Sequence, residues 1–263
     1  MKAKKSLGQN FLKSALALKK IVEAGEISDK DTILEIGSGK GVLTEKLLEK
    51  SGCVIAVEKD HELFDFLQNK FINQIKSGTL VLVHDDILKF NVDKISQNLK
   101  YKIIANIPYN ITGAILKKFL TEKNQPERMI LMVQNEVAKR IVARDGKESI
   151  LSISVKAYGT PEMILKVPAR YFSPAPNVDS AIIAIKNISR KIFVGNKIDE
   201  EQFWKIIRAG FAHKRKKLSS NLKGLSFFVE GQSFAGLGNA RAEELSLTDW
   251  IKLVKDIDIN KKG

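Results

Sequence analysis

The sequence predicts an α/β protein with a doubly wound, mostly parallel sheet of seven strands, followed by a small C-terminal α-helical domain. From residue 32 to about residue 188, short β-rich runs alternate with helix-like segments, as in parallel sheets covered by helices. Beyond residue 188, apolar residues recur at helical spacing. A length of 263 residues with 44% apolar residues suits one domain of ordinary size and a smaller appendage.

Seven runs rich in β-branched and other apolar residues are the expected strands. They lie at 32–36, 53–58, 79–83, 101–105, 128–133, 152–157 and 180–185. Two amphipathic stretches, 42–50 and 61–72, carry apolar residues at helical spacing, for example Leu63, Leu67 and Phe71. We expect these helices to cover the faces of the sheet.

A polar segment at 187–197, which contains Gly195, is expected to be a linker. The sequence therefore places a boundary between a first domain at 1–188 and a second at 189–263. In the second domain, apolar residues at helical spacing follow the acidic start 199–201, which favours a helix N-terminus.

Two further helices are expected near the end of the chain, where Asn239 and Thr248 are suitable N-cap residues. The second domain shows neither repeats nor low-complexity sequence. It is therefore expected to be a small helical domain.

Composition suggests where the protein works and what it meets. The single cysteine, Cys53, lies in an apolar run, so no internal disulfide can form and the reducing cytoplasm is the expected location. No apolar run approaches the roughly 18–20 residues that span a bilayer, so no membrane partner is expected. The formal charge of +14 favours a polyanion such as nucleic acid, although charge alone leaves open a basic protein that binds none.

A glycine-rich turn at 35–41 joins the first expected strand to the next helix. Glycine lets the backbone turn tightly and approach a ligand where a side chain would collide. The glycines alternate through Gly37, Gly39 and Gly41, whereas the dinucleotide fingerprint that places a pyrophosphate is G-x-G-x-x-G. The spacing favours S-adenosylmethionine, which has no phosphate, and leaves a nicotinamide-dependent oxidoreductase as the alternative.

Acidic residues follow the second and third expected strands. Glu58 can accept hydrogen bonds from both ribose hydroxyls of a nucleoside. At the third strand end, Asp85 or Asp86 can accept from an adenine amino group beside an apolar wall that includes Ile87. Each acid alone could be an exposed loop residue, but ligands of open α/β sheets bind at successive strand ends.

The fourth expected strand ends in Asn106, Ile107, Pro108 and Tyr109, and this motif predicts chemistry on a base. An exocyclic adenine amine is a weak nucleophile because its lone pair is delocalised into the ring. Acceptors on its two N–H bonds, the Asn106 side-chain oxygen and the Ile107 carbonyl, can direct that lone pair towards a methyl donor. Pro108 would fix the chain direction, and Tyr109 would stack on an extruded base. The alternative is an ordinary turn with Tyr109 packed on the core.

A second aromatic residue, Phe172, lies in a loop stiffened by Pro174 and Pro176. Its ring could stack on the other face of the base, or it could belong to the core. The sequence leaves both roles open.

Several separate blocks, in order along the chain, resemble the small-subunit ribosomal RNA adenine dimethyltransferase family of the KsgA type. The blocks are residues 7–12, 35–41, 106–109, 133–138, 172–180, 211–222 and 241–243. The resemblance implies a class I, Rossmann-like methyltransferase domain at 1–188 and an RNA-binding domain at 189–263. It also implies that Gln9, Asn10 and Leu12 contribute to the cofactor pocket.

By the same resemblance, four residues match positions of the family that bind S-adenosylmethionine: Gly37, Glu58, Asp86 and Asn106. The implied product is N6,N6-dimethyladenosine at two adjacent adenosines in a 3′-terminal hairpin of small-subunit (16S) rRNA, made in an assembling small subunit. The macrolide-resistance (Erm) branch, which modifies large-subunit rRNA, shares the catalytic blocks. The segment 211–218 is similar to the KsgA branch instead, and the departures at Ser38 and Lys214 remove no proposed functional group.

A basic cluster at 213–217, followed by Lys223, is the expected RNA-binding surface. Its cationic members after His213 are Lys214, Arg215, Lys216 and Lys217. A solvated helix face is the alternative. At the other end of the chain, Lys2, Lys4 and Lys5 are expected to form an arm that orders only with cofactor or RNA.

The expected working form is a monomer without an obligate protein partner or a metal. A second hypothesis is that the protein acts chiefly as an assembly factor of the small ribosomal subunit. The intact motif from Asn106 to Tyr109 favours chemistry.

Overall fold

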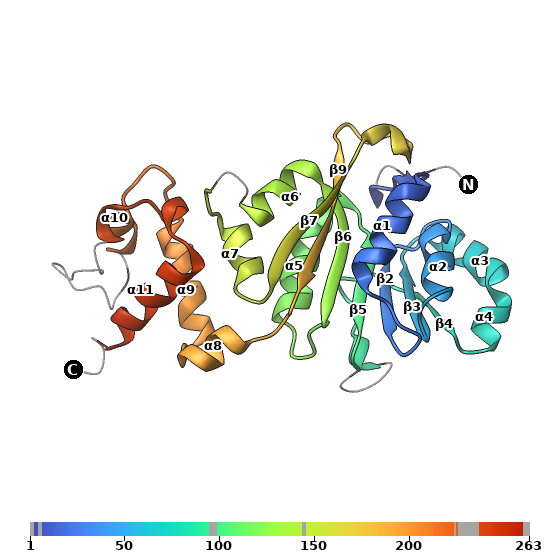
Figure 1. Cartoon of the computed structure of the whole chain (residues 1–263), viewed down its shortest axis with the longest axis horizontal. Coiled ribbons are helices and arrows are strands. Elements are labelled where there is room, and N and C mark those ends of the chain that lie inside the picture. Colours follow the sequence, from blue (N-terminus) through green and yellow to red (C-terminus); the bar gives the residue numbers. More distant parts are fainter. Residues whose placement is uncertain are drawn as a thin grey trace. The chain divides into compact units, whose positions relative to one another are not determined.

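A computed structural model describes residues 3–4, 7–94, 99–143, 146–223, 225 and 237–259 (Figure 1). The chain forms two compact units, one of residues 1–138 and 160–188 and the other of residues 139–159 and 189–263. This grouping moves 139–159 out of the sequence-based first domain. The functional division at residue 188 stays a prediction. No helix in the described parts of the chain is both long and apolar enough to cross a membrane.

The first unit is built on the predicted seven-stranded sheet, with strand order β4-β3-β2-β5-β6-β9-β7 (Figure 1). Its strands are β2 (Thr32–Ile36), β3 (Cys53–Glu58), β4 (Leu80–His84), β5 (Lys102–Asn106), β6 (Arg128–Gln134), β7 (Thr160–Val167) and β9 (Ser180–Lys186). The first five strands in this order, β4, β3, β2, β5 and β6, are parallel. Strand β9 pairs antiparallel with both β6 and β7. The strand order reverses at β2, which lies between β3 and β5, so ligands are expected at the carboxyl ends of these strands.

Helices of the first unit connect the strands. They are α1 (Ala15–Gly25), α2 (Val42–Leu48), α3 (His61–Lys70), α4 (Ile72–Lys76) and α5 (Thr112–Thr121), and α6 (Asn135–Val142) begins in this unit. Ser14 and Asp60 cap α1 and α3 through their side chains. A core of fully buried side chains, including Ile21, Ile33 and Ile104, fixes α1 on the sheet.

A separate two-stranded sheet pairs the N-terminal β1 (Phe11–Leu12) with β8 (Phe172–Ser173) in antiparallel fashion. Phe11 opposes Ser173 and Leu12 opposes Phe172. This pairing holds the N-terminal segment next to the loop before β9.

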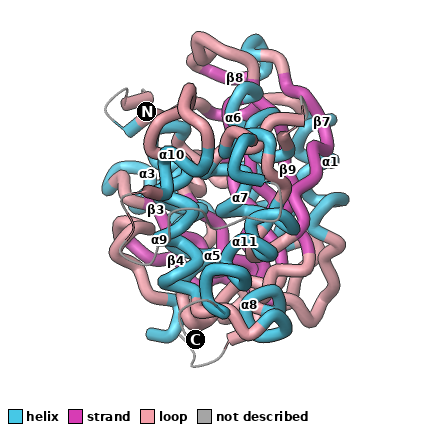
Figure 2. Tube along the Cα trace, turned by 90° about the vertical axis from the view of Figure 1, so that its left-hand side faces the viewer, coloured by secondary structure: helices cyan, strands magenta, loops and turns pink. Residues whose placement is uncertain are grey.

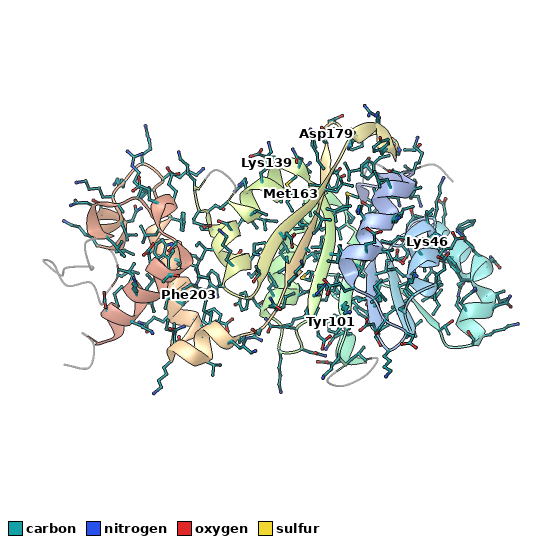
Figure 3. All side chains as sticks on the ribbon, in the orientation of Figure 1. Lys46, Tyr101, Lys139, Met163, Asp179 and Phe203 are labelled. Carbon is teal, nitrogen blue, oxygen red and sulfur yellow. The ribbon has the colours of Figure 1, made fainter. Side chains whose placement is uncertain are left out.

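The second unit is helical, with α7 (Ile150–Lys156), α8 (Lys191–Asn196), α9 (Glu200–Gly210), α10 (Leu218–Leu222) and α11 (Leu247–Ile259) (Figure 2). Phe203 on α9, labelled in Figure 3, is buried. Gly210 allows α9 and α11 to approach closely, because a Cβ there would stand 2.3 Å from the Trp250 ring. Asp199 begins α9 by accepting a hydrogen bond from the Gln202 N–H, as the acidic start predicted.

Four local predictions are wrong. Residues 152–157 are not a strand: Ser149 and Ser152 form a capping box that begins α7, and this local cap outweighs the β-branched isoleucines. The expected linker 187–197 contains α8. Ser246, not Thr248, accepts a hydrogen bond from the Asp249 N–H at the start of α11.

The fourth wrong prediction concerns Asn239, which ends a short 3₁₀ helix (Leu237–Asn239) instead of capping a helix that follows. Its side-chain oxygen accepts a hydrogen bond from Lys217 Nζ at 3.0 Å. The Asn239 side chain therefore links two segments of the chain and does not cap a helix.

Candidate active site

The carboxyl ends of four parallel strands meet around a cavity of about 220 Å³ in the first unit. The turn after β2, the acids after β3 and β4, and the motif after β5 all line it. Among its lining residues are all the predicted cofactor and catalytic residues but one: Gln9, Asn10, Leu12, Gly37, Gly39, Glu58, Asp86, Ile87, Asn106, Ile107, Pro108 and Tyr109. Phe172 is the exception.

The glycine turn after β2 has the backbone that only glycine adopts easily. Gly37 has φ 69° and Gly41 has φ 74°. The Gly37 N–H donates to the Val57 carbonyl at 2.9 Å, which fixes the turn against β3. A Cβ at Gly37 would meet no atom within 4 Å, whereas a Cβ at Gly41 would stand 2.6 Å from the Phe71 ring. Gly37 therefore borders open space in the cavity, and Gly41 packs against the protein.

Glu58 ends β3 as a buried carboxylate, 5% exposed. Its Oε2 accepts from the Gly39 N–H and its Oε1 accepts from the Asp60 N–H, both at 2.9 Å. Burial raises the pKa of Glu58, although these two N–H groups offset part of that effect. Each oxygen retains acceptor capacity, because a carboxylate oxygen can accept two hydrogen bonds.

Asp86, after β4, has a more open environment. Its Oδ1 accepts from the Leu88 N–H at 3.0 Å, and its Oδ2 contacts Lys59 Nζ at 2.8 Å. The Lys59 ammonium lowers the pKa of Asp86. Asp85 also lines the cavity, but its Oδ1 is engaged by the Asp86 N–H. The assignment of the adenine to Asp86 stays a prediction.

Glu35, in β2, also borders the cavity and is 1% exposed. Thr44 on α2 donates its hydroxyl to Glu35 Oε2 at 2.6 Å. Burial raises the pKa of Glu35 to about 7.

Asn106 ends β5 with its amide in a defined orientation. Its Nδ2 donates to the main-chain carbonyl of Asn10 at 3.0 Å, so the same amide presents Oδ1 as its acceptor. Pro108 has an extended backbone, and Tyr109 begins a short 3₁₀ helix (Tyr109–Ile111). The Tyr109 hydroxyl is hydrogen-bonded to the Ser180 hydroxyl, which fixes its ring.

Phe172 lies outside the cavity. The residue is 2% exposed, pairs with Leu12 and belongs to the same hydrophobic core as Leu12 and Leu18. Of the two roles that the sequence left open, this burial favours the core role, and stacking on the base stays a prediction. Asp179, labelled in Figure 3, holds the same loop by accepting from the Ala169 N–H at 3.0 Å.

The predicted RNA-binding residues lie in the second unit, in the loop between α9 and α10 and at the end of α10. Lys214, Arg215, Lys216, Lys217 and Lys223 are exposed. Lys214, Arg215 and Lys216 lie in the loop and not on the helix end that the sequence suggested, whereas Lys217 and Lys223 flank α10.

The predicted N-terminal arm is only partly described. Lys2 and Lys5 lie outside the described residues, whereas Lys4 forms ion pairs with Asp60 and Glu62 at 2.8 and 2.9 Å. That the arm orders only with cofactor or RNA stays a prediction. Sequence reasoning missed Asp60; its only sequence signal is its position at a helix start, two residues after Glu58.

Comparison with known proteins decides the family. Residues 1–258 match the sequence model of the family described as ribosomal RNA adenine dimethylase. The chain belongs to this family. Membership confirms the resemblance inferred from the motif blocks and the prediction of a methyltransferase enzyme.

Named relatives match over nearly the whole chain. The ribosomal RNA small subunit methyltransferase A of Dehalococcoides mccartyi is 44% identical, covering 96% of this chain and 88% of the relative. The protein of the same name from Fusobacterium nucleatum is 39% identical, covering 97% of both chains.

Similar solved structures confirm the fold of this chain. A dimethyladenosine transferase from Plasmodium falciparum matches with TM-score 0.81 at 24% identity, covering 95% of this chain and 98% of that one. The 23S rRNA methyltransferase ErmE matches with TM-score 0.76 at 25% identity, covering 95% and 100%.

Proposed function

We propose that this chain transfers methyl groups from S-adenosylmethionine to N6 of two adjacent adenosines in a 3′-terminal hairpin of small-subunit (16S) rRNA, giving N6,N6-dimethyladenosine during small-subunit biogenesis in the cytoplasm. The observation that carries the proposal is the Asn106 amide at the end of β5, oriented by the Asn10 carbonyl. The small-subunit name of relatives at 39–44% identity supports the choice of substrate. We also propose that the protein acts as a monomer.

The residues around the cavity fit a cationic nucleoside. Gly37 leaves open the space that a Cβ would occupy, Glu58 and Asp86 supply carboxylates, and Ile87 supplies an apolar wall. Glu58 would accept from the ribose hydroxyls and Asp86 from the adenine amino group. When bound, the cofactor supplies an electrophilic methyl group.

The chain's own groups would then prepare the target amine. Asn106 Oδ1 and the Ile107 carbonyl each accept a hydrogen bond from one N–H of this amine. Together they direct the nitrogen lone pair towards the methyl group. Tyr109, held by Ser180, stacks on the extruded base and replaces stacking lost from the RNA. The nitrogen–carbon bond forms as the methyl group leaves its donor, and the cationic product amine releases its proton to water. In the second methylation the same nitrogen carries one remaining N–H, so only one of these two acceptors takes a hydrogen bond from it. The second nitrogen–carbon bond would then form in the same way, and the cationic dimethylated product would release that last proton to water.

In the test, the purified protein is incubated with S-adenosylmethionine and with unmodified small and large ribosomal subunits in the same reaction. Methyl label in the small subunit alone is the expected result. Label in the large subunit alone would support the activity named for ErmE instead. Cofactor binding without any label would favour an assembly factor, and binding of NAD without S-adenosylmethionine would remove the methyltransferase proposal.

A further inference from the structure

Asp60 ties the N-terminal segment to the corner between β3 and α3. Its side chain is 2% exposed and uses both oxygens. Oδ1 contacts Lys4 Nζ and Oδ2 accepts from Gln9 Nε2, each at 2.8 Å. These contacts cross 56 and 51 residues of chain, so one carboxylate fixes two points of a distant segment.

The segment that Asp60 holds is also closed on itself. The Lys4 N–H donates to Gln9 Oε1 at 2.7 Å, and the Leu7 N–H donates to the Lys4 carbonyl at 3.1 Å. Lys4 also contacts Glu62, but that carboxylate is 62% exposed and such ion pairs contribute little. The buried anchor is therefore Asp60.

Beyond Gln9, the same segment becomes a wall of the cavity. Asn10 accepts from the Asn106 amide through its carbonyl. Phe11 and Leu12 pair with β8, and Lys40 Nζ lies 5.0 Å from the centre of the Phe11 ring. The placement of Gln9 by Asp60 therefore directly affects the placement of residues 10–12.

Asp60 also contacts the cavity residue Glu58 and the start of α3. Its N–H donates to Glu58 Oε1 at 2.9 Å, and its Oδ1 accepts from the Glu62 N–H at the start of α3. Burial tends to raise the pKa of Asp60, but hydrogen bonds from Lys4 and Gln9 outweigh this and lower it. At neutral pH the Asp60 carboxylate therefore stays ionised and keeps its ion pair with Lys4.

We infer that Asp60 is a positioning residue whose carboxylate holds Lys4 and Gln9 in place, so that residues 9–12 form a wall of the cofactor pocket before the cofactor binds. The inference rests on the proposed function for the identity of the cofactor. Its consequence is slower escape of cofactor from the pocket, with no part in the transfer step.

The decisive variant is Asp60→Asn, because asparagine keeps the size and the helix cap but loses the charge that pairs with Lys4. Hydrogen exchange of the cofactor-free protein should show faster exchange at the amides of residues 7–12. Calorimetry should show about tenfold weaker S-adenosylmethionine binding, the loss expected for a charge-assisted contact. The KM for the cofactor should rise with kcat at saturation within about twofold of wild type.

Lys4→Met tests the same contact from the exposed side of the segment, where failure to fold is not expected. It should reproduce the exchange change, and the double variant should add little to either single variant. Glu62→Gln is the matched control, because it removes the exposed partner of Lys4 and leaves Asp60 intact. It should change exchange and binding less than twofold.

Wild-type exchange at residues 7–12 in both Asp60→Asn and Lys4→Met would overturn the inference, as would equal effects of Glu62→Gln. The exchange measurement needs no cofactor. If wild-type protein bound no S-adenosylmethionine, the proposed function would fail, and exchange would still decide whether Asp60 anchors the segment.

Discussion

Glu58 and Asn106, at the strand ends of the first unit, already have hydrogen-bond partners within the chain. In the second unit, the basic loop 213–217 exposes its cations to solvent. Chemistry on a single nitrogen needs acceptors held to fractions of an ångström, and burial with fixed partners achieves this. Phosphate contacts depend mainly on charge density, which exposed side chains supply. From this difference we propose that the first unit governs the reaction and that the second unit governs RNA affinity.

The largest expected effect is on turnover in Asn106→Ala. Loss of one acceptor placed for the transition state costs about 10²–10³ in kcat, with subunit affinity unchanged. Single-turnover methylation of small subunits, with filter binding at the same salt, measures both quantities. Wild-type turnover in this variant would contradict the site assignment.

Glu35→Gln tests the energetic consequence of burial in the first unit. The buried carboxyl has its pKa raised from 4.5 to about 7, so wild-type stability falls as pH rises through that range and then levels off. Glutamine carries no charge, so it should raise the free energy of unfolding by up to about 3 kcal/mol at about pH 8 and have little effect near pH 4.5.

Urea denaturation at several pH values measures this effect. Lys216→Gln, on the exposed basic loop, is the control and should change stability by less than about 0.5 kcal/mol at every pH. A Glu35→Gln effect independent of pH would show that the carboxyl is not neutralised by burial.

Replacing Lys214, Arg215 and Lys217 together with glutamine should weaken subunit binding and flatten its log–log salt dependence by about 2, without changing cofactor affinity. Replacing Lys19, Lys20 and Lys46 on the first unit removes the same charge and is the control. Equal flattening by both sets would mean that total charge, and not the basic loop, sets RNA affinity.

The smallest expected effect separates the two pocket acids. Glu58→Gln and Asp86→Asn should each weaken S-adenosylmethionine binding by about tenfold, as for a lost hydrogen bond to a charged group. Burial raises the pKa of Glu58 and Lys59 lowers that of Asp86. On acidification, binding by Asp86→Asn, which relies on Glu58, should therefore fail at higher pH than binding by Glu58→Gln. Calorimetry across pH would reject this order if the two curves coincided.

Much of the fold followed from the sequence because central parallel strands are continuous apolar runs bounded by turns. β7 was missed because it is a partly exposed edge strand with polar residues such as Glu162 and Lys166. The run 152–157 was assigned to a strand because apolar periodicity does not separate short buried helices from strands.

The strand-end residues of the cavity were predictable because strand ends carry the ligand groups of an open sheet, whereas Gln9, Asn10 and Leu12 were implied only by the family resemblance. The contacts that support the cavity were not predictable from the sequence. The bond from Asn106 to the Asn10 carbonyl and the contacts of Asp60 join residues far apart in sequence, and neither has a local pattern. Phe172 shows the same limit, since sequence alone did not separate a stacking ring from a core ring.

The most direct test of the central claim is nucleoside mapping by mass spectrometry of rRNA from unmodified small subunits incubated with S-adenosylmethionine and either wild-type protein or Asn106→Ala. The account predicts N6,N6-dimethyladenosine at two adjacent positions of the 3′ hairpin with wild type, and almost none with the variant. Dimethyladenosine elsewhere, or equal amounts from the two proteins, would contradict it.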